Sequence, residues 1–518
     1  MTADPSHQPA TPPAAGPAAQ PTAGRAAGPA AADLLSLDPE AGAGGRSLVL
    51  RGGTVLTMDD DGSVLEGADV LVTGRRIAAV GPALAVPPGT VEIDARGGIV
   101  MPGMIDTHRH LWQTAMRGYG ADWTLSQYFD WYYVQHGARF RPEDVYAGNL
   151  LGAVEALDEG VTTTVDWSHG LRTPDHAEAA VDALEEVPGR FVLAYGNIFD
   201  APWTWSRTAG LHDLVSRRLR RSDLLGFQMA FDVTGDPQFP ERAAFEVARD
   251  LDAAVTTHAG VRGATDDAAV RLMHEHGFME ERTVYVHAAT LGEESYRLIA
   301  ETGGSVSVAS EAESSGGQGY PPTWRLRAHG IPVSLSTDSS VWGSADMFSA
   351  VRATLAADRA REHLEAHARD ETVTDVGLRA QQAVWWATRG GARALGLDDV
   401  TGSLEPGKKA DVVLLKNDAS PVMAPVLHPW GHVALQAQRG DVRTVLVDGR
   451  VVKHDHRLLG DHVARARAAA EATVEHLRRE VGEEAWSAGR VPGSGTGGFD
   501  SPYTYSDHRG AAAAAPPR

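Results

Sequence analysis

The chain has 518 residues, of which 43% are hydrophobic and 22% charged, as expected of a globular protein with a sizeable core. The formal net charge of −21, from 68 acidic against 47 basic residues, argues against a nucleic-acid-binding surface or an anionic membrane partner. Cysteine is absent, which excludes disulfides, thiol nucleophiles and cysteine-ligated metals, so any metal must be held by His, Asp or Glu.

Both ends of the chain are rich in Ala, Pro and Gly. This composition covers residues 1–45 and 491–518, and because it buries little apolar surface it predicts disordered tails. The N-terminus lacks a basic region followed by an apolar segment, and no run of about 18 apolar residues occurs. We therefore expect a cytoplasmic protein without a membrane partner.

Short β-like runs broken by turns fill residues 47–98, where Asp-Gly at 61–62 and Gly-Arg at 74–75 suit hairpin turns. A similar pattern returns at 402–460, in "ADVVLLKND" and "VRTVLVDGRVVKHD". We expect these two blocks to join in one small β-sandwich domain built from both chain ends. A C-terminal helix is expected at 461–490.

Between these blocks, residues 99–400 alternate apolar, β-branched runs with helical patterns such as "PEDVYAGNLLGAVEALDEG". Near-continuous apolar strands separated by helices indicate a parallel sheet covered on both faces. Eight such units predict an α/β fold, a closed (β/α)₈ TIM barrel. The runs are "GIVMPGMIDTH", "VTTTVDWSH", "RFVLAYGN", "LLGFQMAFD", "DAAVTTHAG", "TVYVHAAT", "GSVSVASEAE" and "IPVSLSTD".

Polar residues that can bind metals stand where several of these strands end. In such a barrel the carboxyl ends of the strands form the rim on which active sites are built. One strand-end histidine is more often structural, but a converging set favours a metal site for a borderline divalent ion, zinc or iron(II). The strand-end residues are His108, His110, His169, His258, His287, Glu311, Glu313 and Asp338.

Motifs along residues 47–460 resemble the amidohydrolase superfamily, in particular its cytosine-deaminase-like and triazine-hydrolase-like branch. "PGMIDTHRH" is similar to the family's first metal motif, "THAG", "VHAAT" and "SLSTDSS" to its later ones, and "TGSLEPGKKADVVLL" to its C-terminal signature. The resemblance implies that His287 contacts the attacking water or the developing oxyanion. The metal ligands that it implies are His108, His110, His258 and Asp338.

These residue types suit metal-assisted hydrolysis. A divalent cation lowers the pKa of bound water toward about 7, so a metal-bound hydroxide can attack at neutral pH. Asp338 can accept the proton and return it to the leaving group, and His287 can stabilise negative charge on the attacked centre. Many relatives bridge two metals through a carboxylated lysine, but the first lysine here is Lys408, so we expect one ion per chain. A glutamate bridge stays open, without a clear candidate.

One position departs from the deaminase pattern. Deaminases of this branch usually carry a glutamate three residues after the third metal-binding histidine, and here that position holds Val261. Alternation along the seventh strand would point Glu311 and Glu313 to the same side. Either could supply the missing catalytic acid, or both are rim carboxylates that contribute only charge.

Further residues are candidates for contact with the substrate. Trp112 and Gln113 follow the first metal motif, and His169 ends the second strand. The aromatic run at 122–135 could cap the pocket, although we expect most of its aromatic residues to pack a helix onto the barrel. The segment "GGQGYPP" at 316–322 is expected to form a flexible loop that shapes the entrance.

Together these features predict a metal-dependent hydrolase acting on a carbon–nitrogen bond, not a peptide bond, of a small cyclic or heteroaromatic substrate. One alternative is a chlorohydrolase-like hydrolytic dehalogenase, which needs no acid at Val261. A second alternative is a non-catalytic metal-binding or ligand-binding barrel. The expected partner is a small molecule, and a homo-oligomer is compatible with the sequence.

Overall fold

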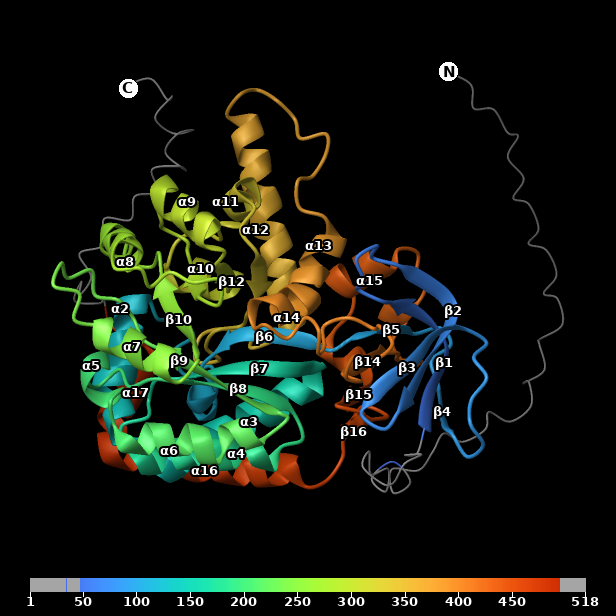
Figure 1. Ribbon diagram of the computed structural model, residues 1–518, viewed down its shortest axis with the longest axis horizontal. Helices are drawn as coiled ribbons and strands as arrows, with labels where there is room; N and C mark the ends of the chain where they lie inside the picture. The colour runs from blue at the N-terminus through green and yellow to red at the C-terminus, as the bar shows by residue number, and fades with distance from the viewer. Residues whose placement is uncertain (1–33, 35–46, 494–518) are drawn as a thin grey trace, which may run out of the picture.

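The computed structural model describes residue 34 and residues 47–493, arranged as a helix-covered sheet beside a smaller all-β unit (Figure 1). Both predicted disordered tails lie almost wholly outside these residues. None of the described helices combines the length and apolar character that a membrane span requires.

Eight parallel strands form the larger sheet, in the order β13 to β6 without interruption. The last strand meets the first, because the Asp338 backbone N–H donates to His108 O (3.0 Å) and the His110 N–H to Asp338 O (3.0 Å). The predicted (β/α)₈ barrel is confirmed. Its strands are β6 (Met104–Arg109), β7 (Val161–Ser168), β8 (Arg190–Tyr195), β9 (Leu225–Ala230), β10 (Ala254–Ala259), β11 (Val284–His287), β12 (Ser305–Val308) and β13 (Val333–Leu335).

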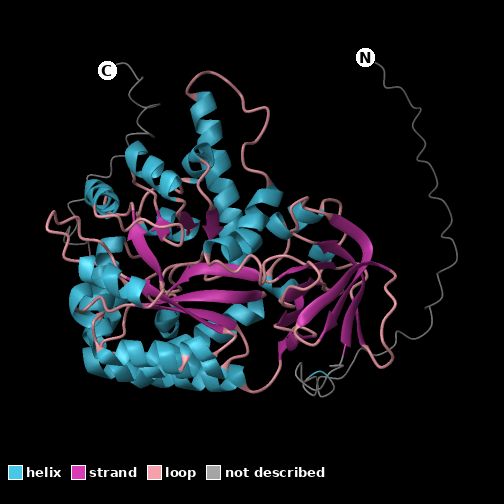
Figure 2. Cartoon of the chain, in the orientation of Figure 1, coloured by secondary structure: helices cyan, strands magenta, loops and turns pink. Residues whose placement is uncertain are grey.

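Amphipathic helices cover the outside of the barrel (Figure 2). Helix α3 (Pro142–Glu159) shows why they form where they do. It starts with Pro142 at a position that needs no N–H donor and stops at Gly160, whose φ of 85° ends the helix. The other long covering helices are α4 (Pro174–Glu186), α6 (Ala209–Arg217), α7 (Arg242–Asp250), α8 (Ala264–Glu275), α9 (Glu293–Thr302), α11 (Thr323–His329) and α12 (Met347–His367).

Both chain ends contribute to the smaller unit, as predicted, but its strands form one nine-stranded mixed sheet where a β-sandwich was expected. Its two halves join where β5 pairs antiparallel with β14, with Met101 opposite Val413. The turn at 74–75 links β2 and β3 as a hairpin. The strands are β1 (Ser47–Leu56), β2 (Val64–Thr73), β3 (Arg76–Pro82), β4 (Val91–Asp94), β5 (Ile99–Pro102), β14 (Val412–Leu415), β15 (Val442–Val447), β16 (Arg450–His454) and β17 (Arg457–Leu458).

Two further features differ from the sequence expectation. The first predicted barrel run is split at Gly103, so β5 belongs to the small sheet and only β6 to the barrel. A side chain at Gly103 would meet Thr162 Oγ1 at 2.0 Å, so only glycine allows this close crossing. The predicted C-terminal helix is two helices, α16 (His462–Val481) and α17 (Glu483–Arg490), separated at Gly482 with a φ of 82°.

Candidate active site

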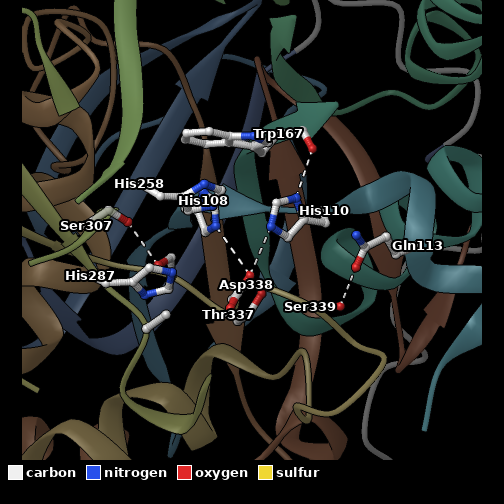
Figure 3. A network of polar contacts seen from close by, with 12 residues as sticks. His108, His110, Gln113, Trp167, His258, His287, Ser307, Thr337, Asp338 and Ser339 are labelled. Carbon is white, nitrogen blue, oxygen red and sulfur yellow. Dashed lines mark hydrogen bonds and ion pairs between the residues drawn. The ribbon is translucent and has the colours of Figure 1, made fainter. Parts of the chain in front are cut away.

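Four histidines and an aspartate meet at the carboxyl end of the barrel (Figure 3). His108 lies in the middle, with its ring centroid 4.7 Å from that of His110 and 5.0 Å from that of His258. Two groups of ligand atoms, each within 4.8 Å of one another, share His108. One contains His108, His258 and His287, and the other His108, His110 and Asp338. The fold therefore places each predicted metal ligand in one of two groups that share His108.

Oxygen atoms hold three of these imidazole rings at Nδ1. In each ring Nε2 is left for a second partner, and a ring that donates from Nδ1 presents Nε2 as a lone-pair nitrogen. This arrangement is typical of histidines that ligate metals. The contacts are His110 Nδ1 to Trp167 O at 3.0 Å, His258 Nδ1 to Asp232 Oδ1 at 2.9 Å and His287 Nδ1 to Glu313 Oε1 at 3.4 Å.

The atoms at the centre of the cluster fit a divalent cation. Both ring nitrogens of His108 and Asp338 Oδ2 are buried without a hydrogen-bond partner among the described residues, although His108 Nε2 lies 3.3 Å from Asp338 Oδ1. Burial holds the pKa of His108 well below its ordinary value, so the ring is neutral. Burial alone would raise the pKa of Asp338, but its contacts with His108 and His110 hold it well below the usual range. Neutral imidazole with carboxylate is a donor set that zinc uses.

The strand ends that carry the cluster are strained. Asp338 has a φ of 58° and His287 a φ of 73°, in the left-handed region that side-chain-bearing residues rarely adopt. The backbone hydrogen bonds of Asp338 to strand β6 hold one of these turns in place. Such strain gathers at functional sites, where surrounding structure imposes a conformation that directs a side chain.

A cavity of about 380 Å³ opens onto this cluster. His110, His258, His287 and Asp338 form one part of its lining, and His169 lies beside them, with its ring centroid 4.5 Å from that of His110. Aromatic side chains supply much of the remaining wall. They are Tyr128, Phe129, Tyr133, Trp167, Trp205, Phe231 and Trp342. A concave apolar pocket with a few polar groups is the usual form of a small-molecule site.

Two of the three residues predicted to bind substrate lie behind this wall. Trp112 is fully buried and packs edge-on against Phe140 at 5.1 Å, so it belongs to the core. Gln113 accepts hydrogen bonds from Tyr128 Oη (2.9 Å) and Ser339 Oγ (2.6 Å) and thereby fixes a wall residue. Only His169 lines the cavity, where it is hydrogen-bonded to Tyr133.

The aromatic run at 122–135 has a divided role. It folds into α2 (Leu125–Tyr128) and the π-helix η2 (Phe129–His136). Its members Tyr128, Phe129 and Tyr133 line the cavity, so the expectation that most of the run serves only for packing is wrong for these three. The other aromatic residues of the run are Trp123, Trp131 and Tyr132, and they pack outside the cavity lining.

The strand alternation assumed for Glu311 and Glu313 is wrong. Strand β12 ends at Val308, and both residues lie in the short helix α10 (Ser310–Gly316), where side chains two apart diverge. Glu313 turns inward, is fully buried and accepts the Ala309 N–H at 2.8 Å. Burial raises its pKa, which the contact with His287 partly offsets. Glu311 instead accepts from Ser344 Oγ at 2.6 Å, outside the cavity lining.

Asp232 is the residue that sequence reasoning missed. Its Oδ1 accepts from the His258 backbone N–H (3.2 Å) and ring Nδ1 (2.9 Å), and the side chain lines the cavity. Burial would raise its pKa. The charge of His258 and the hydrogen bond that its ring donates lower the pKa of Asp232 to about 2. The signal was available, since Asp232 follows the fourth apolar run as Asp338 follows the eighth. Val261, in contrast, adds only apolar surface to the wall.

Comparison with known proteins identifies the family. Residues 99–452 match the model described as the amidohydrolase family. The chain belongs to this family. The prediction of a metal-dependent hydrolase for carbon–nitrogen bonds is thereby confirmed at the level of the family.

Similar proteins are named as deaminases and chlorohydrolases. A 5-methylthioadenosine/S-adenosylhomocysteine deaminase of Symbiobacterium thermophilum is 31% identical, over 82% of this chain and 99% of that protein. A crystal structure of an adenosine deaminase from Xanthomonas campestris with bound zinc has a TM-score of 0.70 and 25% identity, covering 84% of this chain and 99% of that chain. Atrazine chlorohydrolase from Arthrobacter aurescens, complexed with zinc, has a TM-score of 0.72 at 22% identity, covering 82% and 100%, and shows the shared fold alone.

Proposed function

We propose that this amidohydrolase removes an amino group from a small nitrogen heteroaromatic compound of the adenine-nucleoside class, using one divalent metal ion per chain. The observation that carries the proposal is the convergence of His108, His110, His258 and Asp338 on an aromatic-walled cavity of about 380 Å³. The cavity offers flat apolar surfaces to a ring and polar groups to its edge. The similar proteins named as adenosine-derivative deaminases support this substrate class.

His108, His110, His258 and Asp338 would hold the metal ion. A bound zinc or iron(II) ion would act as a Lewis acid and lower the pKa of water toward about 7. The set has no lysine near it, because all four lysines of the chain are paired elsewhere. Lys408 pairs with Glu405, Lys409 with Asp448, Lys416 with Asp94 and Lys453 with Asp158. This absence supports a single ion.

We assign proton transfer to Asp338 and the stabilisation of negative charge to His287. Asp338 has an unpartnered Oδ2 beside the reacting centre, so it can take a proton from water and return it to the leaving amine. Glu313 Oε1 lies 3.4 Å from Nδ1 of His287 and orients the ring, so that an Nε2–H can donate to negative charge that develops on the attacked carbon's substituents. Val261 contributes no proton, so Asp338 performs both transfers in sequence.

Val261 also favours a second candidate, hydrolytic dehalogenation. A halide leaves without being protonated, so that reaction does not need the acid that is missing at this position. A matched substrate pair separates the two reactions. We expect kcat/KM to be higher for ammonia release from adenosine-type substrates than for chloride release from 6-chloropurine riboside. The reverse order would favour the dehalogenase.

Membership of the amidohydrolase family argues against the non-catalytic barrel that the sequence also allowed. Turnover of either member of the substrate pair would exclude it. Because the expected substrate is a small polar molecule, we propose that the enzyme acts in the cytoplasm.

A further inference from the structure

Gln318 carries a buried amide whose oxygen has no hydrogen-bond partner in the part of the chain that the structure describes. The residue lines the cavity and is only 4% exposed, and its Oε1 accepts no hydrogen bond from any described residue. Leaving a buried polar group unsatisfied lowers stability. An unsatisfied group that a native site keeps calls for an explanation, and a bound ligand is one.

The turn that carries Gln318 is fixed tightly next to the catalytic cluster. The Gln318 N–H donates to Glu313 O at 3.1 Å, and Glu313 itself contacts His287. Gly319 has a φ of 125°, and a side chain there would lie 2.7 Å from Cβ of Ala289, two residues beyond His287. The segment 316–322, which was predicted to be a flexible loop, therefore packs at Gly319 against the residues that follow His287. This packing gives the Gln318 amide a defined position in the cavity wall.

We propose that Gln318 is a specificity-determining residue that pairs with the edge of the substrate's heteroaromatic ring. The inference rests on the proposed deaminase function and extends it. An amide offers an acceptor and donors on adjacent atoms. It matches a ring edge where a nitrogen acceptor lies beside an N–H donor, as glutamine matches the edge of adenine. Gln318 thus selects nitrogen heterocycles over carbocyclic amines.

Gln228 provides a matched control. It is also 4% exposed and also has an unpartnered, buried Oε1, but it lies in β9 outside the lining of the cavity. Replacing either glutamine with leucine removes an unsatisfied polar atom at nearly constant volume. We expect both variants to keep or raise the melting temperature by about 1–3 °C. A merely structural role for Gln318 would instead lower it.

Binding and kinetics then separate the two variants. We expect Gln318→Leu to weaken calorimetric binding of adenosine to the metal-free protein by about tenfold and to lower kcat/KM for adenosine in the metal-loaded enzyme by at least as much. Gln228→Leu should match wild type in both. Wild-type binding and kinetics in Gln318→Leu would overturn the inference, and so would equal losses in both variants.

An analogue identifies the ring edge that Gln318 contacts. 7-Deazaadenosine replaces N7, a ring-nitrogen acceptor on the same edge as the 6-amino donor, with C–H. We expect it to lose about tenfold in kcat/KM relative to adenosine with wild type and to show no such loss with Gln318→Leu, because the partner of N7 is already gone. Equal losses in both enzymes would overturn the inference. A wild-type enzyme that releases no ammonia from any of these nucleosides would refute the proposed function instead.

Discussion

Asp232→Asn tests how much this carboxylate contributes to metal affinity, because it orients His258, a proposed metal ligand. Its pKa of about 2 keeps it charged at neutral pH, and its Oδ1 accepts two N–H groups of His258. Hydrogen bonds to a charged group contribute about 1.5–3 kcal/mol and neutral ones about 0.5–1.5 kcal/mol. Asparagine keeps an acceptor oxygen but loses the charge, so the change is about 1–1.5 kcal/mol. The side chain is 39% exposed, and solvent screening favours the lower figure.

A difference of about 1 kcal/mol corresponds to a rise of about fivefold in the dissociation constant of the metal ion, just below the range of about 10–100-fold typical of such supporting groups. Competition with a chromogenic chelator measures it. Asp200→Asn is the control, because Asp200 lines the same cavity but bonds only the adjacent Ala201 N–H among the described residues. Metal affinity within twofold of wild type in Asp232→Asn, or an equal loss in both variants, would refute the reasoning.

Four further outcomes are expected. His258→Ala should reduce metal content from about one ion per chain to a small fraction, measured by elemental analysis. Asp338→Asn should lower kcat by about 10² to 10⁴ through loss of proton transfer, and by more if metal is also lost, in steady-state assays. Glu313→Gln should lower kcat about fivefold by weakening the contact that orients His287, whereas Glu311→Gln should stay within twofold, since that side chain bonds Ser344 outside the cavity. Trp112→Ala should destabilise the protein by about 3–5 kcal/mol in denaturant unfolding, because the side chain is fully buried.

The barrel could be predicted because its strands are long apolar runs bounded by helices, which periodicity reveals. The join between the two ends of the chain was also predictable, since both blocks have the same short β pattern. The split at Gly103 was not, because it depends on the close approach of Thr162, a contact between strands that no local pattern records. The break between α16 and α17 likewise depends on the positive φ of a single residue, Gly482.

In the site, residues at strand ends were predictable and residues beyond them were not. The proposed metal ligands were found because the ends of parallel strands converge on one rim. Glu313 was assigned the wrong geometry because the strand gives way to a helix after Val308. Trp112 and Gln113 were expected in the cavity because the sequence places them next to the first motif, but only the fold shows which way each side chain turns. Asp232 required attention to every strand end rather than to the family's own motifs.

Ammonia release from adenosine by chelator-treated protein, measured as zinc is added back, tests the central claim most directly. The account predicts no release without metal, a rise in proportion to added zinc, and saturation at about one equivalent per chain. Full activity in the metal-free protein, saturation only at two equivalents, or no ammonia at any zinc concentration would contradict it.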